Sequence, residues 1–266
     1  MLAMISVGVN EPVRFDNYRL LCHDAGVKIF LACLFIAIMM FFPAPVRTPA
    51  PPAVDQVEPT PALETLEPVK VETPKPLSKS FLIESVPFIP QTPLKKWDAL
   101  HEDACEEASL LTLRYWVEGR QPDVTEIERE LQGFIAWQVA HDFGPSITLT
   151  QLKRAASQYW VKSWWSEIKV GQSATLDDLR RELAAGNPVV IGAAGRELKN
   201  PHFKNGGPNY HMLVLIGYDE DGFVTNDPGT QFGASYRYTI EIIEAAWHDW
   251  NAQNILSGTR NYLVIK

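Results

Sequence analysis

The chain has 266 residues, a formal charge of −8 and a pI near 5.3. This acidic balance argues against a general nucleic-acid-binding protein, because such proteins need a basic surface to neutralise phosphates. The absence of a glycine-rich phosphate loop and of internal repeats also disfavours nucleotide-binding and solenoid proteins.

Residues 29–42 are a run of fourteen uncharged apolar residues. The run is shorter than the roughly 20 residues of a usual spanning helix. A cleaved signal peptide is disfavoured by the long lead and by the lack of a small-x-small cleavage site. We therefore expect an uncleaved transmembrane anchor. Three basic residues precede it and only Arg47 follows closely, which puts residues 1–28 in the cytoplasm and the rest outside. A cleaved signal would export the same domain.

Residues 43–79 are rich in proline, with ten of the twenty prolines of the chain between 43 and 76. Such a segment buries too little apolar surface to offset its ordering entropy, and proline keeps it extended. We expect a disordered stalk here. Residues 80–266 are then one globular domain, long enough for a sizeable core.

The periodicity of this domain predicts helices first and strands second. Phe81–Phe88 is predicted as an entry strand. A helix follows Asp103, taken as an acidic N-cap, and stops at Gly119. Further helices are predicted over 123–134, 149–160, 175–186 and 239–250, and strands over 189–193, 210–218, 222–225, 235–238 and 262–265. This order indicates an α+β fold of two lobes, a helical lobe followed by an antiparallel sheet lobe, with the site in the cleft between them.

Of the three cysteines, Cys22 lies on the cytoplasmic side, Cys33 lies in the apolar run, and Cys105 is alone in the exported domain. A lone exported cysteine is a reactive thiol or an intermolecular link, although an inert buried cysteine is the plain alternative. Cys105 falls in the first turn of its helix, where free N–H groups favour the thiolate by about 0.3–1 kcal/mol. Glu106 and Glu107 oppose ionisation if they turn toward the sulfur, so an imidazolium partner is required.

His211 is the predicted partner, because it opens the apolar run M-L-V-L-I-G-Y directly after a glycine-rich loop. A polar residue at the mouth of a buried strand is held rigidly, which suits a general base, although it can equally be a structural strand-end histidine. The other exported histidines lie too near the cysteine or in polar contexts typical of a surface: His101, His141, His202 and His248.

Sixteen residues after His211, a predicted hairpin runs into the sequence N-D-P-G. The start of the first strand and the end of the second are neighbours in a hairpin, so Asp227 or Asn226 can reach the ring of His211. Such a group fixes the tautomer of the histidine in a cysteine triad. As an alternative, N-D-P-G is also an ordinary turn sequence.

Four stretches carry a family resemblance: V-P-F-I-P-Q at 86–91, W-D-A-L-H-E-D-A-C-E-E-A-S-L at 97–110, L-R-R-E-L-A-A-G-N-P-V-V-I at 179–191, and Y-H-M-L-V-L-I-G-Y with T-N-D-P-G. With them the sequence resembles the papain-like peptidases of the bacteriocin-processing family, in particular their stand-alone C39-like domains. The resemblance implies a papain-like fold, a nucleophile at Cys105, a base at His211, an orienting Asp227 and an oxyanion-hole glutamine at Gln91. The family often has Cys-Gly-Pro where this chain has Cys-Glu-Glu.

The sequence thus predicts an exported, membrane-anchored bacterial cysteine peptidase that hydrolyses peptides through a thioester, with no metal or organic cofactor and no nucleic acid. The alternatives are an inactive papain-like domain that binds extracellular peptides or cell-wall material, and an adhesion module that uses Trp160, Trp164 and Trp165. We expect those tryptophans in the core or the cleft lining instead. The same triad serves amidases and transpeptidases, so the sequence specifies neither the substrate nor the oligomeric state.

Overall fold

The computed structural model describes residues 76–160 and 167–266. The predicted cytoplasmic segment, the predicted anchor and nearly all of the predicted stalk lie outside the described residues. Within those residues, no helix combines the length and the apolar character that crossing a membrane requires.

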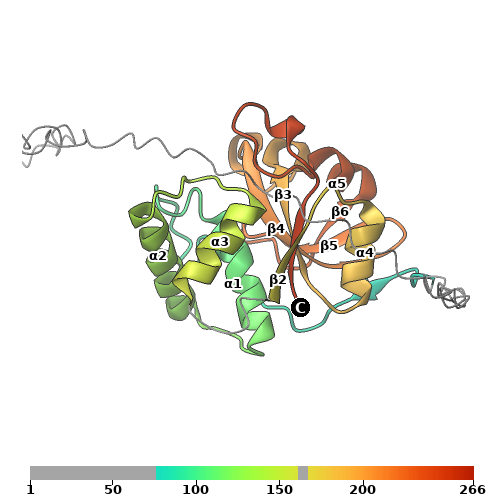
Figure 1. Ribbon diagram of the computed structural model, residues 1–266, viewed down its shortest axis with the longest axis horizontal. Coiled ribbons are helices and arrows are strands. Elements are labelled where there is room, and N and C mark those ends of the chain that lie inside the picture. The colour runs from blue at the N-terminus through green and yellow to red at the C-terminus, as the bar shows by residue number, and fades with distance from the viewer. Residues whose placement is uncertain (1–75, 161–166) are drawn as a thin grey trace, which may run out of the picture. The chain divides into compact units, whose positions relative to one another are not determined.

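The domain consists of an antiparallel sheet with helices on both faces (Figure 1). The helices of the described part are α1 Cys105–Val117, α2 Val124–Ala140, α3 Leu149–Tyr159, α4 Leu176–Ala184 and α5 Ile240–Ala246. Its strands are β1 Phe81–Leu82, β2 Ile168–Gly171, β3 Val189–Ala194, β4 Tyr210–Tyr218, β5 Gly222–Asn226, β6 Tyr236–Thr239 and β7 Tyr262–Ile265. The strands lie in the order β2-β7-β3-β4-β5-β6, and β1 pairs with the end of β4. The predicted α+β class is confirmed.

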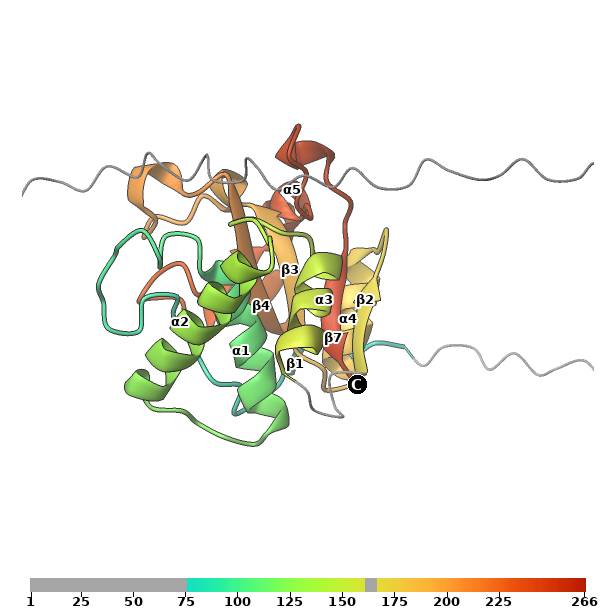
Figure 2. The ribbon, with the colours of Figure 1, turned by 60° about the vertical axis from the view of Figure 1, so that its left-hand side comes forward.

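Helices α1 and α3 cover one face of the sheet, with α2 packed on their outer side, and α4 and α5 cover the other face, as Figures 1 and 2 show. Strand β4 explains this arrangement, because alternate side chains of a strand point to opposite faces. Met212 and Val214 pack with α1 and α3, whereas Leu213 and Leu215 pack with α4 and α5. A strand buried on both faces needs a continuous apolar run, and β4 has one.

A smaller core joins α1 to α2 through Leu111, Tyr115, Ile127 and Leu131. Trp160, at the end of α3, packs beside it with its ring centroid 4.3 Å from that of Phe134. This is the core position expected for Trp160, while Trp164 and Trp165 lie outside the described residues.

Two predicted details were wrong. The entry strand is only the two residues of β1, because the chain turns directly afterwards at Glu84 and Ser85, where Ser85 has a φ of +64°. The N-cap of α1 is Ala104, without a side-chain hydrogen bond, so Asp103 does not cap the helix. Strands β4 and β7 lie at the predicted residues. Most other boundaries differ from the predicted ones at their ends, most of all that of α2, which continues to Ala140, and β2 was not predicted.

Candidate active site

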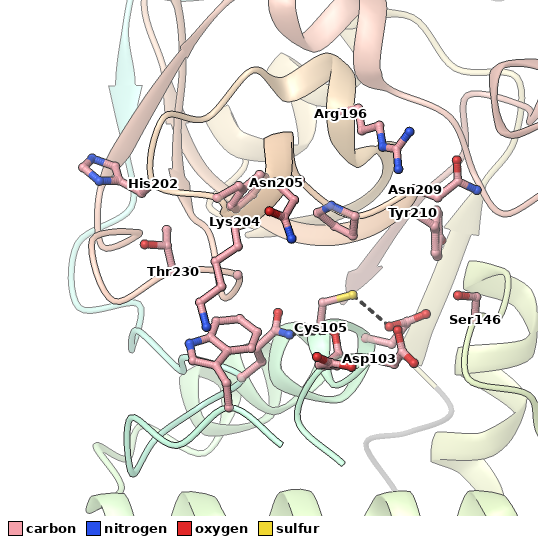
Figure 3. Close-up of a pocket in the computed structure, with 18 of the residues that line it drawn as sticks. Asp103, Cys105, Ser146, Arg196, His202, Lys204, Asn205, Asn209, Tyr210 and Thr230 are labelled. Atoms are coloured by element: carbon pink, nitrogen blue, oxygen red, sulfur yellow. Dashed lines mark hydrogen bonds between the residues drawn. The ribbon is translucent and has the colours of Figure 1, made fainter. Parts of the chain in front are cut away.

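A cavity of about 620 Å³ opens between the start of α1 and the loops at one edge of the sheet (Figure 3). Gln91, Cys105 and Glu106 line the helical side. Arg196 and Lys204 are among the residues on the opposite side. The cavity is therefore lined by carboxylates and by cations as well as by the Cys105 thiol.

Cys105 is the first residue of α1 and only 5% of its surface is exposed. Its backbone N–H has no acceptor within the helix, as for every residue of a first turn. The thiol donates a hydrogen bond to Oε2 of Glu106 over 2.9 Å. Burial, and then the charge of Glu106, raise the pKa of the Cys105 thiol well above its usual range, although the backbone N–H of Met212 acts in the opposite direction. The thiol is thus held neutral in this arrangement.

His211 and Asp227 form a buried pair. Strands β4 and β5 make the expected antiparallel hairpin, which places Asp227 directly after β5 and next to His211. Nε2 of His211 lies 2.7 Å from Oδ1 of Asp227. Burial pushes the pKa of Asp227 up, but the charge and hydrogen bond of His211, with hydrogen bonds from Tyr238 and Gly229, outweigh it and hold that pKa below its usual range. The carboxylate is therefore ionised, Nε2 donates to it, and Nδ1 is left as the basic nitrogen.

The carboxylate of Asp227 is held by three further donors. The Tyr238 hydroxyl donates to Oδ2 over 2.5 Å, the Gly229 N–H to Oδ1 over 2.9 Å, and Nδ2 of Asn200 to Oδ2 over 3.3 Å. Asn226, the alternative orienting group, is used elsewhere, since its Nδ2 donates to the carbonyl of Pro87 over 3.0 Å. Of the two candidates, only Asp227 contacts the histidine.

The ring of His211 packs against Phe203 and Gly229. The Phe203 ring meets it edge-on at a centroid distance of 5.3 Å. A Cβ at Gly229 would lie 2.8 Å from Cε1 of His211, so only glycine fits at this close approach. The His211 side chain is 1% exposed. The thiol of Cys105 donates its hydrogen bond to Glu106 rather than to the His211 ring.

Gln91 lies in the cavity wall, as an oxyanion-hole residue must. Its Nε2 donates to the carbonyls of His101 over 2.7 Å and of Glu102 over 3.1 Å. Both amide hydrogens are therefore occupied, and Gln91 must release one of these carbonyls to donate to a substrate. The His101 ring is clamped between Asp98, at 2.7 Å, and Glu128, at 3.1 Å, which fixes the segment that leads into Cys105.

Sequence reasoning missed the residues that complete the site from distant segments. Asn200 and Tyr238 were not singled out, because an asparagine in a loop and a tyrosine in a strand carry no local signal. Glu106 had a signal in its position next to the cysteine. Of the two acids named as possible opponents of ionisation, Glu106 turns to the sulfur, whereas Glu107 faces Gln138 of α2.

A thiol at a helix N-terminus beside a strand-borne His–Asp pair is the arrangement used by cysteine peptidases. The family model of the Peptidase_C39 like family matches residues 83–255, and the chain belongs to this family of cysteine peptidases. Among solved structures, the chain matches a Bacillus anthracis protein described as a C39-like peptidase. The two share 19% identity with a TM-score of 0.46, over 71% of this chain and 98% of the other. The search for relatives among curated proteins gave no significant match.

Proposed function

We propose that the chain is an exported, membrane-anchored cysteine peptidase that cleaves peptide bonds with Cys105, His211 and Asp227. The observation that carries this proposal is the buried His211–Asp227 pair, which leaves Nδ1 of the histidine as the basic atom near a cavity lined by Cys105. Membership in a family of cysteine peptidases supports the same reaction class.

In the proposed reaction, Nδ1 of His211 takes the thiol proton and the sulfur attacks the peptide carbonyl. The backbone N–H of Cys105 and the amide of Gln91 hold the oxyanion, and one such donor typically lowers the barrier by roughly 3–4 kcal/mol. The imidazolium then protonates the leaving amine, and water hydrolyses the thioester. Asp227 keeps the imidazole in the required tautomer throughout.

The proposed location rests on the sequence. An anchor at residues 29–42 and a stalk over 43–79 would hold the domain outside the cytoplasm, where peptides or proteins are the substrates.

The test is the rate at which iodoacetamide alkylates Cys105 of the full chain across the pH range, with the labelled cysteine identified by mass spectrometry. Rapid labelling at pH 6 that is lost in His211→Ala indicates a thiolate–imidazolium pair. Labelling only above about pH 8, unchanged by the substitution, would mean an ordinary thiol and would rule the peptidase mechanism out.

One observation favours the second candidate, an inactive domain that binds extracellular peptides or cell-wall material. The Cys105 thiol donates a hydrogen bond to Glu106, and the pKa of the thiol is raised well above its usual range. An unreactive thiol in a protein that still binds peptides would select this function.

A further inference from the structure

Glu106 is a buried acid in direct contact with the sulfur that is to react. It is the second residue of α1, and only 1% of its surface is exposed. Its Oε2 accepts the thiol hydrogen of Cys105 over 2.9 Å, the contact drawn in Figure 3, and its Oε1 accepts the backbone N–H of Ile147 over 3.4 Å. These two hydrogen bonds hold Oε2 against the sulfur and Oε1 against the loop before α3.

The carboxyl of Glu106 has no cationic partner within residues 76–160 and 167–266, where it forms no ion pair with lysine, arginine or histidine. The titratable groups that interact with it are acidic or neutral: Cys105 and Glu107 from α1, Tyr210 from β4, and Asp249, which lies behind Tyr210 with Oδ1 at 3.3 Å from the phenolic oxygen. Arg196 lines the same cavity but forms no ion pair with Glu106. Burial, and then the charge of Glu107, raise the pKa of Glu106 well above its usual range.

A thiolate and a carboxylate in hydrogen-bond contact away from water are two like charges that disfavour each other strongly. Cys105 can therefore ionise only when Glu106 is protonated. In that state the thiolate has no hydrogen left to donate, and the O–H of the acid instead donates to the sulfur anion. The same contact that suppresses the thiolate when Glu106 is charged thus stabilises it when Glu106 is neutral.

We propose that Glu106 is a further catalytic residue, which must carry its own proton before Cys105 can give up the thiol proton. This inference rests on the proposed peptidase function. The thiol proton moves to Nδ1 of His211, the sulfur forms its bond to the carbonyl carbon, and the imidazolium later passes that proton to the leaving amine. Glu106 keeps its proton and donates it only as a hydrogen bond. Its deprotonation at higher pH switches the nucleophile off.

The structure offers a matched pair of variants, Glu106→Gln and Glu107→Gln. Glutamine at 106 keeps an oxygen for the N–H of Ile147 and a donor for the sulfur but cannot ionise. Glu107 is also buried on the same turn, but its carboxyl faces Gln138 instead of the sulfur. Removal of its charge lowers the pKa of Glu106, because the Glu107 charge raises it.

The experiment is the rate of Cys105 alkylation by iodoacetamide in the full chain between pH 5 and pH 10. The wild type should lose rate as the pH rises, the reverse of an ordinary thiol. Glu106→Gln should abolish that loss and label about tenfold faster or more at pH 9. Glu107→Gln should keep the loss and shift it to lower pH. Profiles of wild type and Glu106→Gln that superimpose would overturn the inference.

A second measurement separates this inference from the peptidase proposal. Thiolate absorbance at 240 nm, titrated in a His211→Ala background, should show a lower thiol pKa with Glu106→Gln, because the contact with Glu106 does not involve the histidine. No change there refutes the role of Glu106 even where His211 proves essential. If a thermal melt shows that the Glu106→Gln variant is not folded, Glu106→Met is measured instead. That variant has neither charge nor donor and should also lack the alkaline loss of rate, but with slower labelling than the glutamine variant.

Discussion

Asp227→Asn is the substitution that most directly tests the His211–Asp227 pair, because it removes the charge and almost no volume. The asparagine oxygen can still accept from Nε2 of His211 and from the N–H of Gly229. Its amide nitrogen then replaces the oxygen that faces the Tyr238 hydroxyl and Nδ2 of Asn200. The contact with Asn200 becomes one between two donors.

The loss expected from this change follows from the hydrogen bond it weakens. A hydrogen bond to a charged group typically contributes about 1.5–3 kcal/mol, and each 1.36 kcal/mol is a factor of ten. Loss of the carboxylate 2.7 Å from Nε2 should therefore reduce the His211-dependent alkylation rate of Cys105 at pH 6 by roughly 10- to 150-fold.

The assay is the labelling rate of the full chain, with Tyr238→Phe as the matched control. The control removes one donor to Asp227 and keeps the charge of the carboxylate. The labelling rate of Tyr238→Phe should therefore fall only a few-fold, which corresponds to about 1 kcal/mol in the barrier. A rate in Asp227→Asn equal to that of the wild type, or a loss in Tyr238→Phe as large as that in Asp227→Asn, would refute the orienting role of the carboxylate.

Three further predictions concern the close contact at His211, the buried acid Glu107 and the core between α1 and α2. Gly229→Ala places a Cβ 2.8 Å from Cε1 of His211 and 2.9 Å from Cε1 of Phe203, so it should displace the ring. Labelling at pH 6 should fall by about tenfold or more with a nearly unchanged thermal melt, and unchanged labelling would contradict this close approach. Burial raises the pKa of Glu107 to about 7, so the folded state binds more protons than the unfolded chain and stability falls as the pH rises from about 4.3 toward 7. Glu107→Gln should remove this part of the pH dependence in urea midpoints measured at pH 5 and pH 8, and a parallel decline in both proteins would disprove it. Leu111→Ala should lower the unfolding free energy by about 2–5 kcal/mol, because Leu111 is fully buried between α1 and α2. A urea titration that gave less than about 1 kcal/mol would show that the site collapses around the cavity.

The sequence by itself determined the hairpin and the order of the elements other than β2. The run from Tyr210 to Tyr218 is a strand at the predicted residues, because a continuous apolar run of this length suits a strand buried on both faces. Gly119 and Gly186 follow α1 and α4 with φ of +63° and +87°, a conformation that glycine adopts without a Cβ penalty. The position of Cys105 in the first turn followed from these local patterns, and so did the contact of His211 with the end of β5, although the pattern left Asp227 and Asn226 both open as its partner.

Only the tertiary structure decided the electrostatic state of the site. Side chains from segments 27 and 11 residues away, Asn200 and Tyr238, hold the carboxylate of Asp227. Glu106 faces the sulfur while its neighbour Glu107 faces α2. Both are glutamates in the first turn of the same helix, so the local sequence does not predict which of them contacts the sulfur. The pKa of a buried group depends on the packing and the charges that other segments bring to it. Local periodicity places a residue on an element, but it does not specify which distant groups surround that residue.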